Sequence, residues 1–294
     1  TRVSSSAASD VYKSQLKIMP DDRKTIKAYI FMSYENLINV LQNQSLKLIL
    51  PQETNDVFEC NPVFDPIWLE ESAYSEANEV GFISFCSDYK SSAMWGLYGD
   101  SHKGVCIEFE FPYTSIDDTR PELEYHLDFD HEAALLEHES EGKSLILSDV
   151  KYSNQRVAFL NEEELKREFE LLSDKPDDYK NWCKERHQET YVESLHRKDI
   201  VWQGEKEKRI LFNLWRDGII SRGELFFVKG LNKYIRRILL GWKCSRSTNK
   251  TVLIVNNTLV QEAVYIVNVE RVHARFDTFD VYTDSEEPYN INIF

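Results

Sequence analysis

Two apolar runs, GFISFCS at 81–87 and GVCIEFEF at 104–111, constrain the fold of this chain more than any other feature. Short apolar runs of this composition, with aromatic and β-branched residues, are typical of β-strands. The segment between them is long enough for a two-turn helix that starts after Ser91 or Ser92, because serine caps helix N-termini well. The sequence therefore predicts two strands joined through a short helix that carries aromatic and polar side chains.

The rest of the chain adds strands and helices in separate groups. Strands are predicted at 27–32, 46–50, 149–153, 207–213, 223–229, 235–241 and 263–272, and helices at 34–44, 66–79, 131–139, 161–172, 177–197 and 248–259. Parallel α/β folds alternate strand and helix more regularly, so we expect an α+β fold. We expect a flexible segment at 1–20 and one α+β domain at 21–294, with an acidic and helical insertion at about 113–198.

Charge and composition exclude several classes of protein. A formal net charge of −15 argues against non-specific binding to phosphate backbones, although basic residues gather at 206–246 and leave a local nucleic acid site open. No run approaches the roughly 20 apolar residues of a membrane helix, and the opening residues lack the pattern of a secretory signal. We therefore expect a cytoplasmic protein without a membrane partner. The five cysteines form no C-x-x-C pair, which disfavours both a disulfide framework and a zinc ribbon.

Two short stretches are candidate binding segments. Asn55 and Asp56 follow a strand and a turn marked by proline, where such residues bind a ligand or cap their own turn. Ser87 ends a predicted strand, and Trp95 and Tyr98 follow it on the predicted helix. The two rings would form a ligand platform or part of the core.

The third candidate is the stretch WQGEKEKR at 202–209. If it is a strand, Glu205, Glu207 and Arg209 project from one face, because side chains alternate along a strand. In a cleft, repulsion between the two neighbouring carboxylates would raise the pKa of one of them, and the arginine would lower the pKa of the other. Such a pair is suited to act as a general base or to hold a developing cation. On a solvent face the same residues would form only a surface ladder.

Metal chemistry is not expected. Three histidines and two aspartates between 126 and 138 match no familiar spacing of metal ligands. The usual hydrolase, phosphotransferase and dehydrogenase signatures are absent from the sequence.

Taken in order, these motifs resemble a widespread bacterial family known only as a domain of unknown function. The resemblance extends from about residue 27 to 254 and is carried by NDVFE at 55–59, FCS at 85–87, MWGLY at 94–98, GVCIEF at 104–109, VKY at 150–152, WQGEKEKR at 202–209 and ILLG at 238–241. The chain departs from the family pattern at Val57, where proline is usual, and at Ile30 and Phe31, where a basic residue and a tyrosine are common.

The layout of these motifs also resembles that of ADP-ribosyltransferases, which implies split antiparallel sheets with flanking helices and NAD as the substrate. By this resemblance Glu205 or Glu207 would be the catalytic carboxylate that meets the ribose. Tyr29 would be the contact from the first strand, Ser87 a polar contact from the second, and Trp95 or Tyr98 the ring that stacks on nicotinamide. Asn55, Asp56 and Arg209 complete the expected NAD-binding set.

Three functions follow as expectations. The first is an ADP-ribosyltransferase-like protein that modifies a macromolecular acceptor or hydrolyses NAD, as a toxin or phage-defence effector. The second is a sensor or interaction module that binds a nucleotide, and a partner protein, without breaking a bond. The third is a nuclease or other hydrolase, whose carboxylates would come from Asp56, Glu59, Glu205 and Glu207.

Overall fold

The computed structural model describes residues 24–63, 79–114, 124–127, 145–173, 176, 178–215, 218–259 and 266–286. The predicted flexible segment at 1–20 lies outside the described residues, as do the predicted helix at 131–139 and nearly all of the one at 66–79.

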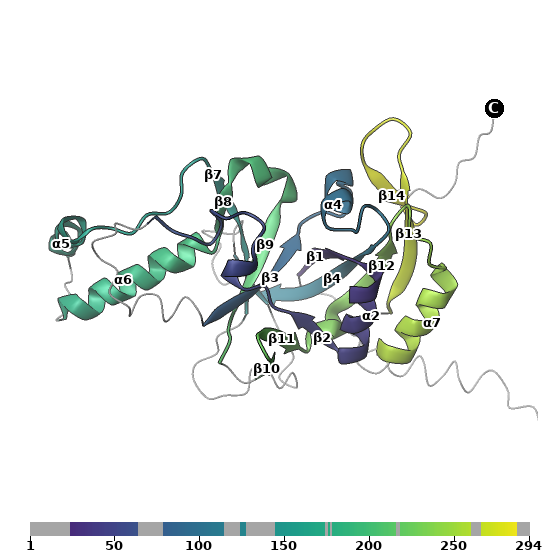
Figure 1. Cartoon of the computed structure of the whole chain (residues 1–294), viewed down its shortest axis with the longest axis horizontal. Coiled ribbons are helices and arrows are strands. Elements are labelled where there is room, and N and C mark those ends of the chain that lie inside the picture. The colour runs from purple at the N-terminus through teal and green to yellow at the C-terminus, as the bar shows by residue number, and fades with distance from the viewer. Residues whose placement is uncertain are drawn as a thin grey trace, which may run out of the picture.

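Along the described chain strands and helices alternate over residues 25–114, and longer runs of strands and a pair of helices at 162–194 follow (Figure 1). The strands are β1 (Thr25–Met32), β2 (Ser45–Lys47), β3 (Val80–Cys86), β4 (Val105–Thr114), β5 (Glu124–Leu127), β6 (Ile146–Asp149), β7 (Lys151–Ser153), β8 (Arg197–Asp199), β9 (Glu207–Asn213), β10 (Ile219–Arg222), β11 (Leu225–Lys229), β12 (Ile235–Leu240), β13 (Asn268–Ala274) and β14 (Val281–Thr283). The α-helices are α2 (Tyr34–Asn43), α4 (Ser92–Leu97), α5 (Glu162–Glu170), α6 (Tyr179–Ser194) and α7 (Thr248–Leu259), and the 3-10 helices are η1 (Pro51–Glu53), η3 (Ile200–Glu205) and η4 (Leu231–Tyr234). The α+β class expected from the sequence is confirmed.

The main sheet has the strand order β1-β3-β9-β6-β5-β4-β12-β13-β14, and β1 also pairs with β4. The pairings β1-β3-β9-β6-β5-β4 therefore return to β1 and close a ring, which the sequence did not predict. Smaller sheets are formed by β10, β11 and β2 and by β7 and β8. The strand pairs are mainly antiparallel, as the expected split antiparallel sheets imply, but β12 pairs with β13, and β7 with β8, in parallel.

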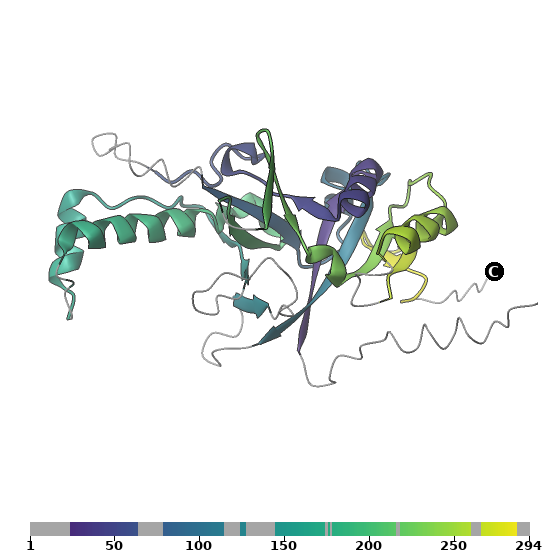
Figure 2. The same cartoon turned by 90° about the horizontal axis from the view of Figure 1, so that it is seen from below.

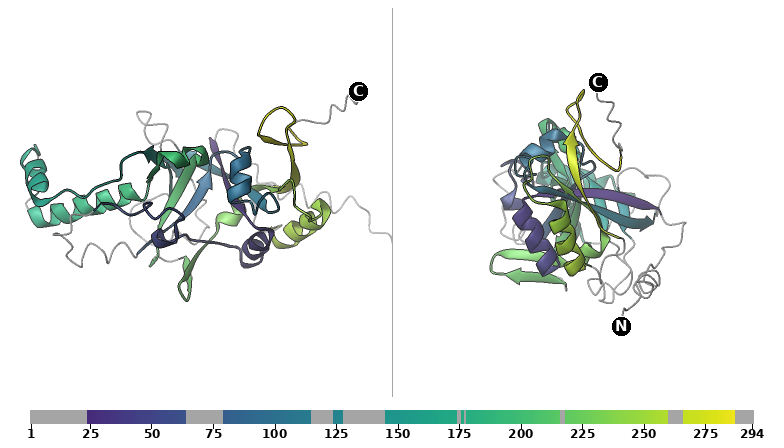
Figure 3. Two further views of the ribbon diagram at one scale, coloured as in Figure 1. Left: turned by 45° about the horizontal axis from the view of Figure 1, so that its top comes forward. Right: turned by 90° about the vertical axis from the view of Figure 1, so that its right-hand side faces the viewer.

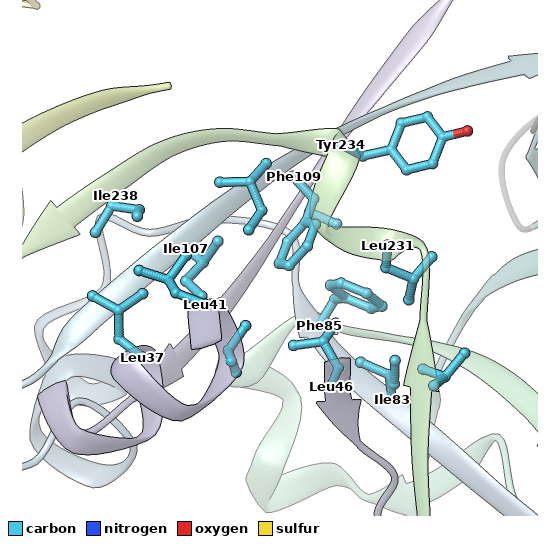
Figure 4. Close-up of a cluster of buried hydrophobic side chains, with 14 of the residues drawn as sticks. Leu37, Leu41, Leu46, Ile83, Phe85, Ile107, Phe109, Leu231, Tyr234 and Ile238 are labelled. Carbon is cyan, nitrogen blue, oxygen red and sulfur yellow. The ribbon is translucent and has the colours of Figure 1, made fainter. Parts of the chain in front are cut away.

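One face of the main sheet forms the largest hydrophobic core. Ile107 and Phe109 of β4 point to this face, where α2 supplies Leu37 and Leu41 (Figure 4). Val255 of α7 belongs to the same core. The two helices lie side by side against the strands (Figure 3). Ser33 caps α2 as its sequence indicates, because its side chain accepts a hydrogen bond from the Asn36 amide.

The opposite face carries a smaller hydrophobic cluster together with charged residues. The predicted strand-helix-strand unit is confirmed as β3, α4 and β4, and α4 places Met94 and Trp95 against Phe31 of β1 on this face. Cys106 and Glu108 of β4 alternate with the core residues of the first face. Helices α5 and α6 extend away from the sheet (Figures 1 and 2).

Candidate functional site: a buried charged cluster beside β9

The observed β9 coincides with the strand predicted at 207–213, but the strand does not extend back through residues 202–206. Residues 200–205 form η3, capped by the Asp199 side chain, which accepts from the Val201 amide at 2.9 Å. Lys206 then adopts a left-handed backbone conformation with φ 47°, and β9 begins at Glu207. The condition under which Glu205, Glu207 and Arg209 would share one strand face is therefore not met, because Glu205 lies in η3. Glu207 and Arg209 do share one face of β9 because they are two residues apart.

Arg209 has no exposed surface, and its guanidinium joins several segments of the chain. Its Nε donates to Glu207 Oε1 at 2.6 Å, Nη1 donates to the Leu195 carbonyl at 2.5 Å, and Nη2 donates to Glu59. The guanidinium also lies over the Phe82 ring, 4.4 Å from its centroid. Arg209, which we expected to bind NAD, thus binds two buried carboxylates in the structure.

Lys198 is a central residue that the sequence analysis missed. Its Nζ lies 2.6 Å from Glu205 Oε2, 3.2 Å from Glu207 Oε2 and 3.3 Å from Glu59 Oε2, and the side chain is buried. The Lys-x₆-Glu spacing is not a recognisable motif, since it arises from the turn that links β8 through η3 to β9. We call Glu59, Lys198, Glu205, Glu207 and Arg209 the β9 cluster.

The β9 cluster contains three carboxylates and two cations, and its members differ in how burial and charge affect them. Burial raises the pKa of Glu59 in spite of Arg209 and Lys198. For Glu207 burial acts in the same direction, but the charge and hydrogen bonds of Arg209 outweigh it and lower the pKa. Burial acts to lower the pKa of Lys198, but the surrounding carboxylates raise it by a larger amount. The net shift is upward, so the ammonium stays charged.

Tyr98 contacts the cluster at Glu205, and two other predicted binding residues lie near this contact. The Tyr98 hydroxyl donates to Glu205 Oε1 at 2.6 Å. Burial and Glu205 raise the pKa of this hydroxyl overall, although the nearby Asn55 side chain acts to lower it. The Ser87 Oγ donates to the Lys206 carbonyl at 2.8 Å, between the two glutamates. Residues from four separate segments are therefore brought together, and Tyr98 is half-buried there.

Asp56 and Trp95 have local structural contacts. Asp56 Oδ1 accepts from the Phe58 amide at 2.9 Å, which is the turn-capping alternative considered for the sequence. Trp95 has no exposed surface, and its Nε1 donates to the Tyr89 carbonyl at 2.8 Å. Of the two candidate stacking rings, only Tyr98 reaches the β9 cluster and the solvent.

Tyr29 is linked to the cluster by a row of residues that runs across the sheet. Tyr29 pairs with Cys86, and Cys86 pairs with Glu207. On its other side Tyr29 pairs with Glu108, which in turn pairs with Arg237. Directly paired residues point to the same face, so one row carries all five side chains.

At the far end of this row lies a second group of ions, which we call the β4 ladder: Lys27, Glu108, Arg237 and Glu270. Arg237 donates to Glu108 Oε2 at 2.6 and 2.9 Å, and Lys27 Nζ lies 3.1 Å from Glu108 Oε1. Glu270 Oε1 is 3.8 Å from Arg237 Nη1.

A cavity of about 210 Å³ adjoins the β9 cluster at Glu59 and Lys198. Of the residues predicted for the NAD site, Asp56 alone lines it, whereas Ser87, Tyr98 and Glu205 do not. No group of three or more His, Cys, Asp or Glu residues in the described part of the chain is arranged to hold a metal ion.

The site and fold thus define an α+β protein with a buried ionic cluster at the start of an inner strand of a large sheet. Residues 94–210 match the model of a family described as a protein of unknown function (DUF2971), which supports the predicted relation to an uncharacterised family. The matched range includes Tyr98, Lys198, Glu205, Glu207 and Arg209 of the site. No curated protein and no solved structure matches the chain. None of the helices in the described ranges combines the length and apolar character needed to cross a membrane.

Proposed function

We propose that the chain binds NAD on the Tyr98 side of the β9 cluster and breaks the bond between nicotinamide and ribose. The observation that carries the proposal is the 2.6 Å hydrogen bond from Tyr98 to Glu205, made beside Ser87. The ADP-ribosyltransferase resemblance assigns a ring, a carboxylate and a hydroxyl to these three residues. Such an activity would suit a toxin or a phage-defence effector.

The strand arrangement is a second support. The proposed layout requires a contact from the first strand, a polar group from the second and a late glutamate on neighbouring strands. The order β1-β3-β9 makes these strands adjacent, and Tyr29, Cys86 and Glu207 lie in register across them.

Glu205 is the carboxylate that would face the substrate. When nicotinamide leaves with the electron pair of the broken bond, positive charge develops on the ribose, and a nearby carboxylate stabilises it. Water or the acceptor then bonds to the ribose carbon and releases its proton. Glu207 accepts hydrogen bonds from Arg209 through both oxygens. It would therefore act as a positioning residue, since Lys198 links it to Glu205.

Binding without bond cleavage is the second candidate, and one observation favours it. Lys198 and Arg209 already contact all three carboxylates of the β9 cluster. A paired carboxylate stabilises a developing cation less well than a free one, because the neighbouring cation opposes it.

The test is nicotinamide release from NAD by purified protein, with cell lysate as a source of acceptors, together with the thermal shift caused by NAD. We expect release to be lost in Glu205→Gln and reduced in Tyr98→Phe, with a folded protein in both cases. Glu224→Gln, an exposed glutamate on the turn before β11, is the matched control and should retain activity.

A thermal shift without nicotinamide release would identify the binding-only function. The absence of both would overturn the NAD proposal.

A further inference from the structure

The cavity beside Glu59 and Lys198 is separate from the Tyr98 side of the cluster. Its walls come from the turn 56–61, from 153–157, and from the end of α6 with β8. Backbone hydrogen bonds fix the first two walls to each other, because the Val63 amide donates to the Val157 carbonyl at 2.7 Å and the Phe159 amide donates to the Val63 carbonyl at 3.0 Å. The cavity is therefore built by paired backbone segments.

Charge in the cavity excludes a strongly anionic or cationic ligand. The lining contains three carboxylates and three cations: Asp56, Glu59, Asp199, Arg156, Arg197 and Lys198. An anion would meet the carboxylates and a cation would meet the guanidinium groups, each with a desolvation cost. A hydroxyl group both donates and accepts hydrogen bonds, so it suits such a mixed lining.

The neutral polar residues of the cavity agree with this. Two hydroxyls and three carboxamides complete the polar lining: Ser153, Ser194, Asn61, Asn154 and Gln155. The Nε of Arg197 is buried and has no hydrogen-bond partner among the described residues, although Nη2 of the same side chain donates to Glu193 at 2.5 Å. This nitrogen has essentially no exposed surface, so a ligand would be bound by the other polar groups that line the cavity.

One side of the cavity is aromatic. Phe58 is 60% exposed and lines the cavity beside Arg156, whose guanidinium lies 5.3 Å from the ring centroid. An exposed ring gives an apolar surface for the C–H groups of a sugar, while the surrounding polar groups bind its hydroxyls. The volume of about 210 Å³ is below the roughly 300 Å³ at which pockets for drug-sized ligands begin, and it suits a single sugar ring.

We propose that this cavity is a second binding site, and that it takes a neutral sugar ring, as a free monosaccharide or as the ribose of a nucleoside. The site is distinct from the proposed NAD site, because Ser87, Tyr98 and Glu205 do not line it, although Lys198 of its lining contacts Glu205. A sugar bound here would lie against Glu59 and Lys198.

The experiment is saturation-transfer NMR and titration of the whole chain with D-ribose, D-glucose, adenosine and inorganic phosphate. We expect at least one of the three sugar-containing probes to bind and phosphate not to compete. Binding of a free sugar or of adenosine alone identifies the source of the ring, and either result supports the proposal.

Two variants locate the binding. Asp199→Asn keeps the cap of η3 but removes the charge, and we expect about tenfold weaker binding, the effect of weakening one charged hydrogen bond. Asp178→Asn is the matched control, since Asp178 caps α6 in the same way outside the cavity. Gln155→Ala, on the exposed rim, tests the site without touching a cap, and Gln52→Ala is its control.

Three outcomes would overturn the proposal: no binding by any sugar-containing probe, binding by phosphate in place of sugar, or unchanged affinity in both cavity variants. The rate of nicotinamide release by Asp199→Asn should equal that of the wild-type chain. The sugar-site proposal is therefore tested with Asp199→Asn and Gln155→Ala, and the NAD proposal with Glu205→Gln and Tyr98→Phe, so that either can fail without the other.

Discussion

The β9 cluster and the β4 ladder lie on the same face of the sheet, but they are assembled differently. The ladder joins residues of neighbouring strands, β1, β4, β12 and β13, whose register alone makes them neighbours. Its cations also reach solvent, since the Lys27 side chain is 49% exposed and that of Arg237 12% exposed, whereas Glu108 is buried. The β9 cluster instead joins a loop, β8, η3 and β9, and all five side chains are buried.

The β4 ladder is an ordinary feature of paired strands, whereas the β9 cluster is constrained by the cost of burying its ions. Burying ions is costly, and pairing often only offsets the loss of hydration, so apolar residues of similar volume would stabilise the fold as well or better. A partly exposed ladder avoids most of that cost. The β9 cluster does not avoid it, which is the reason to seek function there.

The largest expected effect is that of Arg209→Met compared with Arg237→Met. Loss of Arg209 leaves Glu59 and Glu207 buried with one fewer cation, and we expect a loss of about 3–5 kcal/mol in the free energy of unfolding. Loss of Arg237 leaves the buried Glu108 paired with the partly exposed Lys27, and we expect a loss of about 2 kcal/mol. Urea unfolding of both variants measures the difference. An equal or larger loss in Arg237→Met would remove the distinction between the two groups.

Lys198→Met and Lys27→Met make the same comparison for the ammonium groups. Lys198 contacts three buried carboxylates, so its removal should destabilise the chain by about 3 kcal/mol. Lys27 contacts one carboxylate from an exposed position, and we expect at most about 1 kcal/mol. Thermal unfolding at one pH is sufficient, and similar melting temperatures for the two variants would contradict this ranking.

The third prediction concerns pH and distinguishes two carboxylates within the β9 cluster. The folded pKa of Glu59 is raised above its ordinary 4.5, so its contribution to stability is complete below that value and is lost as the pH rises through the folded pKa. The folded pKa of Glu207 is lowered, so its contribution is present above 4.5 and is lost as the pH falls.

The stability difference between the unchanged chain and Glu59→Gln should therefore shrink as the pH rises above 4.5. The corresponding difference for Glu207→Gln should grow as the pH rises towards 4.5. Urea unfolding across this range measures both, with Glu224→Gln as the control for removing one exposed charge. Slopes of the same sign for the two buried residues would be inconsistent with this assignment.

The sequence predicted local structure better than the assembly of the site. The runs at 81–87 and 104–111 and the Ser33 cap specify their own conformations, and the structure agrees with them. The position of Glu205 in η3 was not predicted, because a six-residue 3-10 helix followed by a left-handed lysine has no periodic signal. Lys198 was missed because its partnership with Glu59 depends on segments 139 residues apart in the sequence. The ring of strands likewise rests on pairings distant in the chain, for which hydrophobic patterns give no register.

The smallest expected effect on stability is that of Tyr98→Phe, and its control is Tyr34→Phe. Each change removes one hydroxyl hydrogen bond, from Tyr98 to Glu205 at 2.6 Å or between Tyr34 and Thr251 at 3.0 Å. We expect both variants to lose about 1 kcal/mol, because a single hydrogen bond contributes little net stability.

Their effects on the NAD-induced thermal shift should differ, since only Tyr98 meets the β9 cluster. A reduced shift in Tyr98→Phe beside an unchanged one in Tyr34→Phe would show that the cluster meets a ligand on this side. Equal shifts in the two variants would mean that the Tyr98–Glu205 contact serves the fold alone, and the β9 cluster would then be a buried counterpart of the β4 ladder.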